Sequence, residues 1–147
     1  MASKTALDTN FEKGFFRMAY PSSWKKEFQD AEASWQLSLQ GPGTAFIVIA
    51  ADLDAGVDEM LEAALQTLKD DYPELEYETS TGEICGAPSK VVEVRFFSFD
   101  FSNLCRLEAI PSEEGTILFL FQCNDFDAEE IEPVFEAIRA SMSLLSE

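Results

Sequence analysis

Two short runs of this sequence are apolar at nearly every position, and they constrain the fold more than any other feature of the chain. The runs are TAFIVIAA at residues 44–51 and TILFLFQC at residues 116–123. The side chains of a strand alternate between the two faces of its sheet, so a strand that is apolar throughout needs cover on both faces. We therefore expect a sheet that lies between two other layers.

Two segments with helical spacing are suited to form those layers. One is residues 57–71, and the other is residues 128–142, where Asp127 and Glu130 have the spacing of a capping box. The other periodic segments resemble strands with short connections, which favours antiparallel neighbours. The predicted fold is a three-layer α/β/α sandwich whose mainly antiparallel sheet has about six to seven strands. In the first helix, the apolar stripe consists of Val57, Met60, Leu61, Ala64, Leu65 and Leu68.

Two hairpins are expected within this sheet. Residues 34–40, SWQLSLQ, alternate between apolar and polar, and the turn GPG at residues 41–43 leads from them into the first apolar run. Residues 89–101 form the longest predicted strand, which Ser102 and Asn103 are expected to turn back on itself. With a loop of about four residues, Arg95 would lie opposite Glu108 as a cross-strand ion pair.

The chain of 147 residues has the usual size of one domain, and 46% of its residues are hydrophobic. Residues 1–12 show no periodicity and are expected to form a flexible leader, whereas residues 13–147 are expected to fold as a single domain. The three cysteines lack any CxxC pair, which predicts free thiols in a reducing compartment. Together with the absence of a signal-like or membrane-spanning stretch, this predicts a cytoplasmic protein.

The charge of the chain limits the partners that it would bind. Its 28 acidic residues outnumber its 10 basic residues, and the formal net charge is −18. Nucleic acids and anionic lipids would be repelled by most of the surface. The charge is uneven, because the first 26 residues carry five basic and only two acidic side chains. We expect a monomer or weak dimer whose partner is another protein, with a basic surface that the acidic field attracts.

The residues that catalysis usually needs are missing or unmarked. The chain has no histidine, which removes the usual general base and the commonest metal ligand. Neither GxGxxG nor GxxxxGK[ST] occurs, so no nucleotide cofactor is expected. Carboxylates remain, and Asp52, Asp54 and Asp58 are weak candidates for a divalent-metal site, although helix capping explains them more simply. A similar acidic group follows at Asp125, Asp127, Glu129 and Glu130.

Aromatic residues are the other candidates for a functional surface. Phe97, Phe99 and Phe101 alternate toward the end of a predicted strand, where an exposed stripe would bind a partner helix or strand. If a helix covers these side chains, they are ordinary core residues. Trp35 has the same two interpretations, as a partner-binding or a core aromatic residue.

Three segments resemble bacterial relatives of the Mog1/PsbP-like superfamily. FFRMAYPSSW resembles the strand, Tyr-Pro pair and tryptophan that open these domains. GEICGAPSKVVEVRF is similar to a middle segment in which a glycine and a small residue precede a strand. FDAEEIEPVFEAIRASM is similar to the final helix, with Met142 where the last aromatic residue often stands. The resemblance implies an α/β/α sandwich with an antiparallel sheet, in agreement with the periodicity.

The resemblance also implies a function, because most members of this superfamily are non-enzymatic binders. They include proteins that bind the GTPase Ran, proteins that assist the oxygen-evolving complex and chaperones of type VI secretion effectors. The leading hypothesis is therefore a non-catalytic protein-binding or chaperone-like domain. The alternatives are a carboxylate-based metal-binding module or enzyme, and a carrier with an apolar cleft between sheet and helix.

Overall fold

The computed structural model describes residues 7–98, 100–113 and 115–144, and within them the chain forms ten strands and two helices. Seven strands build one antiparallel sheet in the order β3-β4-β5-β9-β8-β7-β6. They are β3 (Lys25–Asp30), β4 (Ser34–Gln40), β5 (Phe46–Asp52), β6 (Glu76–Ile84), β7 (Ala87–Ser98), β8 (Phe101–Ser112) and β9 (Gly115–Asn124). A second sheet has the order β1-β2-β10 and contains β1 (Thr9–Lys13), β2 (Phe16–Tyr20) and β10 (Ser143–Leu144).

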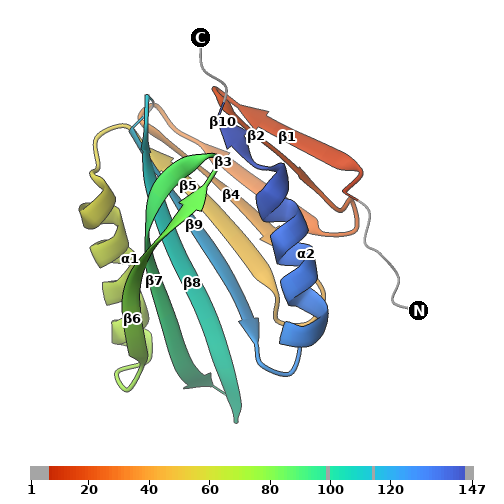
Figure 1. The fold of residues 1–147 in the computed structure, drawn as a ribbon, viewed down its shortest axis with the longest axis vertical. Coiled ribbons are helices and arrows are strands. Elements are labelled where there is room, and N and C mark those ends of the chain that lie inside the picture. Colours follow the sequence, from red (N-terminus) through yellow and green to blue (C-terminus); the bar gives the residue numbers. More distant parts are fainter. Residues whose placement is uncertain (1–6, 99, 114, 145–147) are drawn as a thin grey trace.

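The two helices lie on opposite faces of the large sheet (Figure 1). Helix α1 (Val57–Asp71) packs on β8 and β9 from one side. Helix α2 (Ala128–Ser141) and the small sheet cover the other side, with α2 touching both β9 and β2. This arrangement confirms the predicted α/β/α sandwich, and the observed helix bounds agree with the predicted ones to within one residue.

The central strand β9 shows why both faces need cover. Its side chains alternate, so that Phe119 and Phe121 enter the core beneath α2 while Leu118 and Leu120 pack into the core beneath α1. Phe119 is completely buried. The apolar run at residues 116–123 therefore serves two hydrophobic cores at once, as its composition predicted.

The hairpin between β7 and β8 differs from the prediction. Ser98 pairs with Phe101, so the connection is two residues long and Ser102 belongs to the returning strand. Arg95 lies opposite Leu104, and the predicted pairing of Arg95 with Glu108 is wrong. Asp100 has φ +67°, a left-handed conformation that suits the tight turns of two-residue hairpins.

Part of the expected N-terminal leader forms a strand. Residues 9–12 of the expected leader belong to β1, which pairs antiparallel with β2, whereas residues 1–6 lie outside the described part of the chain. Phe11 anchors this strand, because its side chain is buried against Phe16, Phe28 and Trp35. Five residues with one buried aromatic are too short for alternation to predict a strand.

A buried carboxylate fastens α2 to the sheet. Glu108 of β8 is completely buried, and its oxygens accept hydrogen bonds from Ser89 and from Arg106 Nε at 3.2 Å. Arg139 of α2 donates to both carboxylate oxygens, at 2.7 and 2.8 Å, and also to the Glu83 carbonyl oxygen. A buried charge is tolerated only with such partners, so this network fixes the helix over β8.

All three cysteines are free, as predicted, and Cys105 and Cys123 are buried. Burial raises the pKa of Cys105 to about 12. Burial also raises the pKa of Cys123 to about 11, with the carboxylate of Glu132 acting in the same direction. These thiols are therefore protonated at neutral pH and behave as small apolar side chains.

Replacing Glu108 should destabilise the fold strongly. The Glu108→Ala substitution leaves Arg139 and Arg106 without their shared partner, and we expect the free energy of unfolding in urea to fall by about 3 kcal/mol. Glu93→Ala is the matched control, because Glu93 also faces Arg106 but at 3.9 Å and with 57% of its side chain exposed. The control should change stability by less than about 0.5 kcal/mol. Equal losses in the two variants would contradict the role of the network.

The buried thiols predict a loss of stability at alkaline pH. Above pH 9.0, the ordinary pKa of the group, the unfolded chain releases the Cys105 proton while the folded chain keeps it. The free energy of unfolding should therefore fall between pH 9 and about 12. In Cys105→Ala this fall should be less steep by about 1.4 kcal/mol per pH unit. As a control, denaturant titrations around pH 7 should give both proteins the same dependence of the free energy of unfolding on pH. If that free energy also falls equally steeply in both proteins between pH 9 and about 12, the prediction is refuted.

Candidate functional site

The structure separates the aromatic residues that the sequence grouped into one stripe. Phe101, the first residue of β8, pairs with Ser98, and Phe97 is the neighbour of Ser98 in β7, so Phe97 and Phe101 lie on opposite faces of the sheet. Phe99 falls outside the described residues. Phe97 is 78% exposed and Phe101 is 39% exposed, so neither is a core residue. Trp35, in contrast, is buried among Phe11, Phe16 and Phe28, as its interpretation as a core residue requires.

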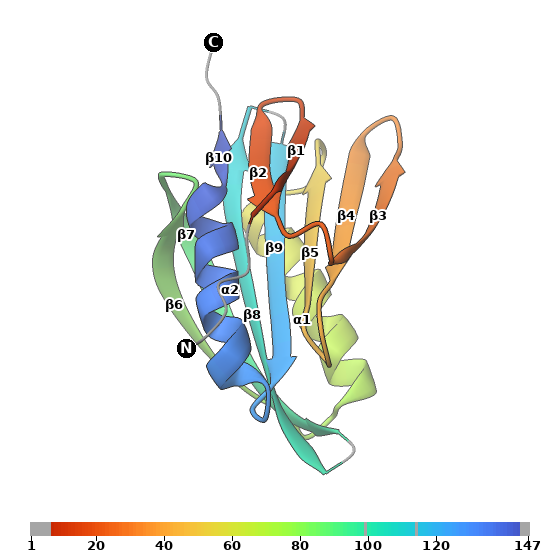
Figure 2. The same cartoon turned by 90° about the vertical axis from the view of Figure 1, so that its right-hand side faces the viewer.

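A third aromatic side chain joins this end of the sheet. Phe126, in the connection between β9 and α2, is 80% exposed, and its ring meets that of Phe101 edge to face at 5.7 Å. We call Phe97, Phe101 and Phe126 the aromatic end. The β7–β8 hairpin that carries two of them extends beyond the other elements (Figure 2). Sequence reasoning missed Phe126, whose signal was an apolar side chain between Asp125 and Asp127 in a turn.

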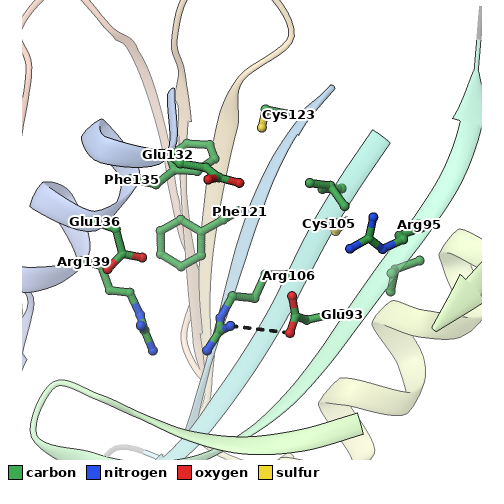
Figure 3. Close-up of a pocket in the computed structure, with 12 residues that line it drawn as sticks. Glu93, Arg95, Cys105, Arg106, Phe121, Cys123, Glu132, Phe135, Glu136 and Arg139 are labelled. Carbon is green, nitrogen blue, oxygen red and sulfur yellow. Dashed lines mark ion pairs between the residues drawn. The ribbon is translucent and has the colours of Figure 1, made fainter. Parts of the chain in front are cut away.

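A cleft of about 360 Å³ opens between α2 and the strands β7, β8 and β9. Helix α2 contributes Glu132, Glu136 and Arg139 to its lining. The strands contribute charged groups of their own, and Phe121 and Phe135 form an apolar wall between the two sides (Figure 3). The charged groups from the strands are Glu93, Arg95 and Arg106.

Two of the three arginines in the cleft are neutralised by the protein itself. Arg106 contacts Glu93 and Glu108, and Arg139 contacts Glu108. Arg95 is exposed and makes no ion pair with any described residue. Among the described residues of the cleft, Arg95 is therefore the one arginine without an ion pair, and Glu132 and Glu136 of α2 line the same cleft. Its cysteines, Cys105 and Cys123, are protonated for the reason given above, so neither supplies a nucleophile.

Two of the three weak metal candidates make local contacts through their carboxylates. Asp52 accepts a hydrogen bond from the Asp54 backbone at 2.9 Å, as in an Asx turn, and Asp58 pairs with Lys90 at 2.8 Å. Glu59 accepts a hydrogen bond from the backbone N–H of the N-cap residue Gly56. Within the described residues, no three side chains of the metal-binding types converge. A metal site at Asp52, Asp54 and Asp58 therefore remains a prediction without a geometric basis.

The second acidic group has a structural use that the sequence did not reveal. Asp127 is the N-cap of α2, but its carboxylate makes no capping bond and instead accepts one from the Thr44 hydroxyl at 3.1 Å. The predicted capping box of Asp127 and Glu130 is therefore wrong. Thr44 also accepts a hydrogen bond from the Asn124 backbone, so these contacts tie the start of α2 to the loop before β5.

A second opening lies on the other face of the sheet. It measures about 500 Å³ between α1 and the strands β6 and β7, and its apolar lining includes Leu61, Leu65, Tyr77 and Val92. The ion pair of Lys90 and Asp58 borders it. Like the cleft beside α2, it lies between sheet and helix, and its more apolar lining is the one that the carrier hypothesis requires.

The length and polarity of the helices decide whether they could cross a membrane. In the part of the chain that the structure describes, no helix has both the length and the apolar character needed to cross a bilayer.

No protein-family model matches the sequence, and no curated protein matches it. Solved structures do match, at low sequence identity. One is CyanoP, the cyanobacterial PsbP of Synechocystis sp. PCC 6803, with a TM-score of 0.58 and 11% identity. The match covers 93% of this chain and 92% of CyanoP.

Two other similar structures come from other bacteria. A protein of unknown function from Pseudomonas aeruginosa has a TM-score of 0.53 and 16% identity, and the match covers 95% of this chain and 96% of that one. LpqN, which is involved in cell envelope biogenesis of Mycobacterium tuberculosis, has a TM-score of 0.53 and 12% identity over 89% of this chain and 83% of its own. The comparisons thus show that the chain shares its fold with a PsbP protein, in agreement with the resemblance that its sequence motifs carry.

Proposed function

We propose that this protein is a non-catalytic, chaperone-like binding domain that holds an apolar, basic segment of another protein on its aromatic end. The observation that carries the proposal is the exposure of Phe97 and Phe126, which leave about four fifths of their surface in water. Large apolar side chains that are exposed at the same end of a sheet mark a surface that a partner covers. Aromatic side chains of this kind commonly dominate the binding energy of an interface.

The charge around the aromatic end indicates the chemistry of the partner. Asp100 and Asp125 are next to Phe101 and Phe126 in the chain, and Glu129 follows in the first turn of α2. All three acidic residues are exposed or partly exposed. A segment that combines apolar side chains with lysine or arginine would match this pattern, and the net charge of −18 would speed its approach.

The cleft beside the aromatic end extends this surface along α2. Glu132 and Glu136 would face a basic residue of the partner, and the wall of Phe121 and Phe135 would face an apolar one. The described residues of the cleft include neither an activated nucleophile nor histidine, which favours binding over catalysis. The similar structures accord with this interpretation, since they include a PsbP protein and a protein involved in cell envelope biogenesis. Free cysteines support a cytoplasmic location.

Removing the exposed rings should abolish capture of the partner. We expect the double variant Phe97→Ser/Phe126→Ser to lose a protein that the unmodified chain retains from a lysate of the source organism. With the isolated partner, its dissociation constant should rise by about 30-fold or more. The measurements are affinity capture with identification by mass spectrometry, followed by calorimetric titration.

Leu53→Ser is the matched control for this experiment. Leu53 is 53% exposed and follows β5, next to Gly115 and hence at the opposite end of the sheet from the β7–β8 turn. Its substitution removes a similar exposed apolar side chain and should leave capture unchanged. The proposed surface would be overturned if the unmodified chain, the double variant and Leu53→Ser all retained the partner equally. It would also be overturned if the three captured the same set of proteins.

A further inference from the structure

Strand β3 is an edge strand whose outer side is open. It is the first strand in the order of the large sheet, and none of the described strands pairs with it except β4 (Figure 2). All six of its residues, KKEFQD, are exposed. An open edge presents unpaired N–H and C=O groups that can form a ladder with another strand.

The turn after β3 shows which backbone groups face outward. The Ala31 N–H donates to the Ser34 carbonyl oxygen at 2.8 Å, so these two residues form a hydrogen-bonded pair. Along an antiparallel strand, every second residue directs its backbone groups to the same neighbour. Lys25, Glu27 and Gln29 therefore bond to β4, and the backbone groups of Lys26, Phe28 and Asp30 point away from the sheet.

We propose that a second copy of this chain pairs with β3 across a two-fold axis at Phe28, so that Lys26 of each copy lies opposite Asp30 of the other. In an antiparallel pair, residues that lie opposite each other direct their side chains to the same face of the sheet. A two-fold axis normal to the sheet therefore passes beside one residue, and that residue lies opposite its own copy. With the axis at Phe28, the three outward residues form hydrogen-bonded pairs throughout. The two Phe28 rings are then neighbours at the centre of the interface.

The charges favour this register over the neighbouring one. Lys26 and Asp30 would form two symmetric ion pairs, whereas an axis at Glu27 would place the two Glu27 side chains against each other. Phe28, which is 37% exposed in one copy, would gain cover. Asp30 already accepts from Lys13 at 3.0 Å, and a carboxylate has the capacity for both lysines.

The rest of the surface also favours β3 over the other edge of the sheet. The free edge strand β6 carries Glu76, Glu78 and Glu83 and no basic residue, so two copies of it would repel each other. Strand β3 belongs to the part of the chain where basic residues are most frequent. Two molecules with a charge of −18 would therefore approach through their least acidic side. Lysines on an edge discourage unspecific pairing, and here a matching aspartate makes the pairing specific.

A charge-swap experiment tests this interface. Sedimentation velocity is recorded on the purified full chain from about 1 µM to about 1 mM, the range in which small interfaces dissociate. The unmodified chain should form dimers within this range. Lys26→Glu and Asp30→Lys should each raise the dissociation constant roughly tenfold, because two attractive pairs become repulsive. The double variant Lys26→Glu/Asp30→Lys should restore dimerisation, because its opposed charges match again.

Lys25→Glu is the matched control, because it makes the same charge change on the same strand. Its side chain lies on the other face and has no charged residue opposite it in the proposed register. Dimerisation of this control should be unchanged. The proposal is overturned if the unmodified chain stays monomeric throughout the range, if Lys25→Glu weakens the dimer as much as Lys26→Glu, or if the double variant is not restored. Circular dichroism of each variant confirms that it is folded, so a failure of pairing is not mistaken for unfolding.

Discussion

The fold depends on keeping both faces of β9 away from water. Phe121 packs against Phe135 of α2 and Phe119 against Phe16 of β2, while Leu118 and Leu120 need α1 on the other face. A single layer on one side would leave half of this strand exposed, so the two helices are required by the same eight residues of sequence at 116–123. The strands β5 and β8, which pair with β9 on either side, lie between the same two layers.

This central constraint also explains where the surface is free to vary. Each helix covers the middle of the sheet, and the strands at either edge and the tip of the β7–β8 hairpin lie beyond that cover. Apolar side chains in these places do not serve the cores. Phe97 and Phe126 lie at the ends of elements, and Phe28 lies on an edge strand, so their exposure is compatible with a stable fold and requires another explanation. The aromatic end would be covered by a segment of another protein, and β3 by a second copy of this chain.

Much of the architecture could be predicted from periodicity, because strongly apolar strands and striped helices leave few arrangements. The candidate site was less predictable, since it depends on the exact length of one turn. A connection of two residues after Ser98 puts Phe97 and Phe101 on different faces and moves Glu108 away from Arg95. The partner that Glu108 does find, Arg139, is 31 residues away in the chain, and no local pattern links the two. Short elements such as β1 and β3 were missed for the same reason, because tertiary contacts define them.

The network around Glu108 has a consequence for the order of folding during synthesis. The sheet strands that surround this carboxylate are made before α2, yet the helix supplies Arg139, one of its two cationic partners. Until that last helix leaves the ribosome, closing the core would bury a negative charge that is only partly compensated. Native burial of the Glu108 charge thus depends on α2, which lies after all seven strands of the large sheet in the sequence.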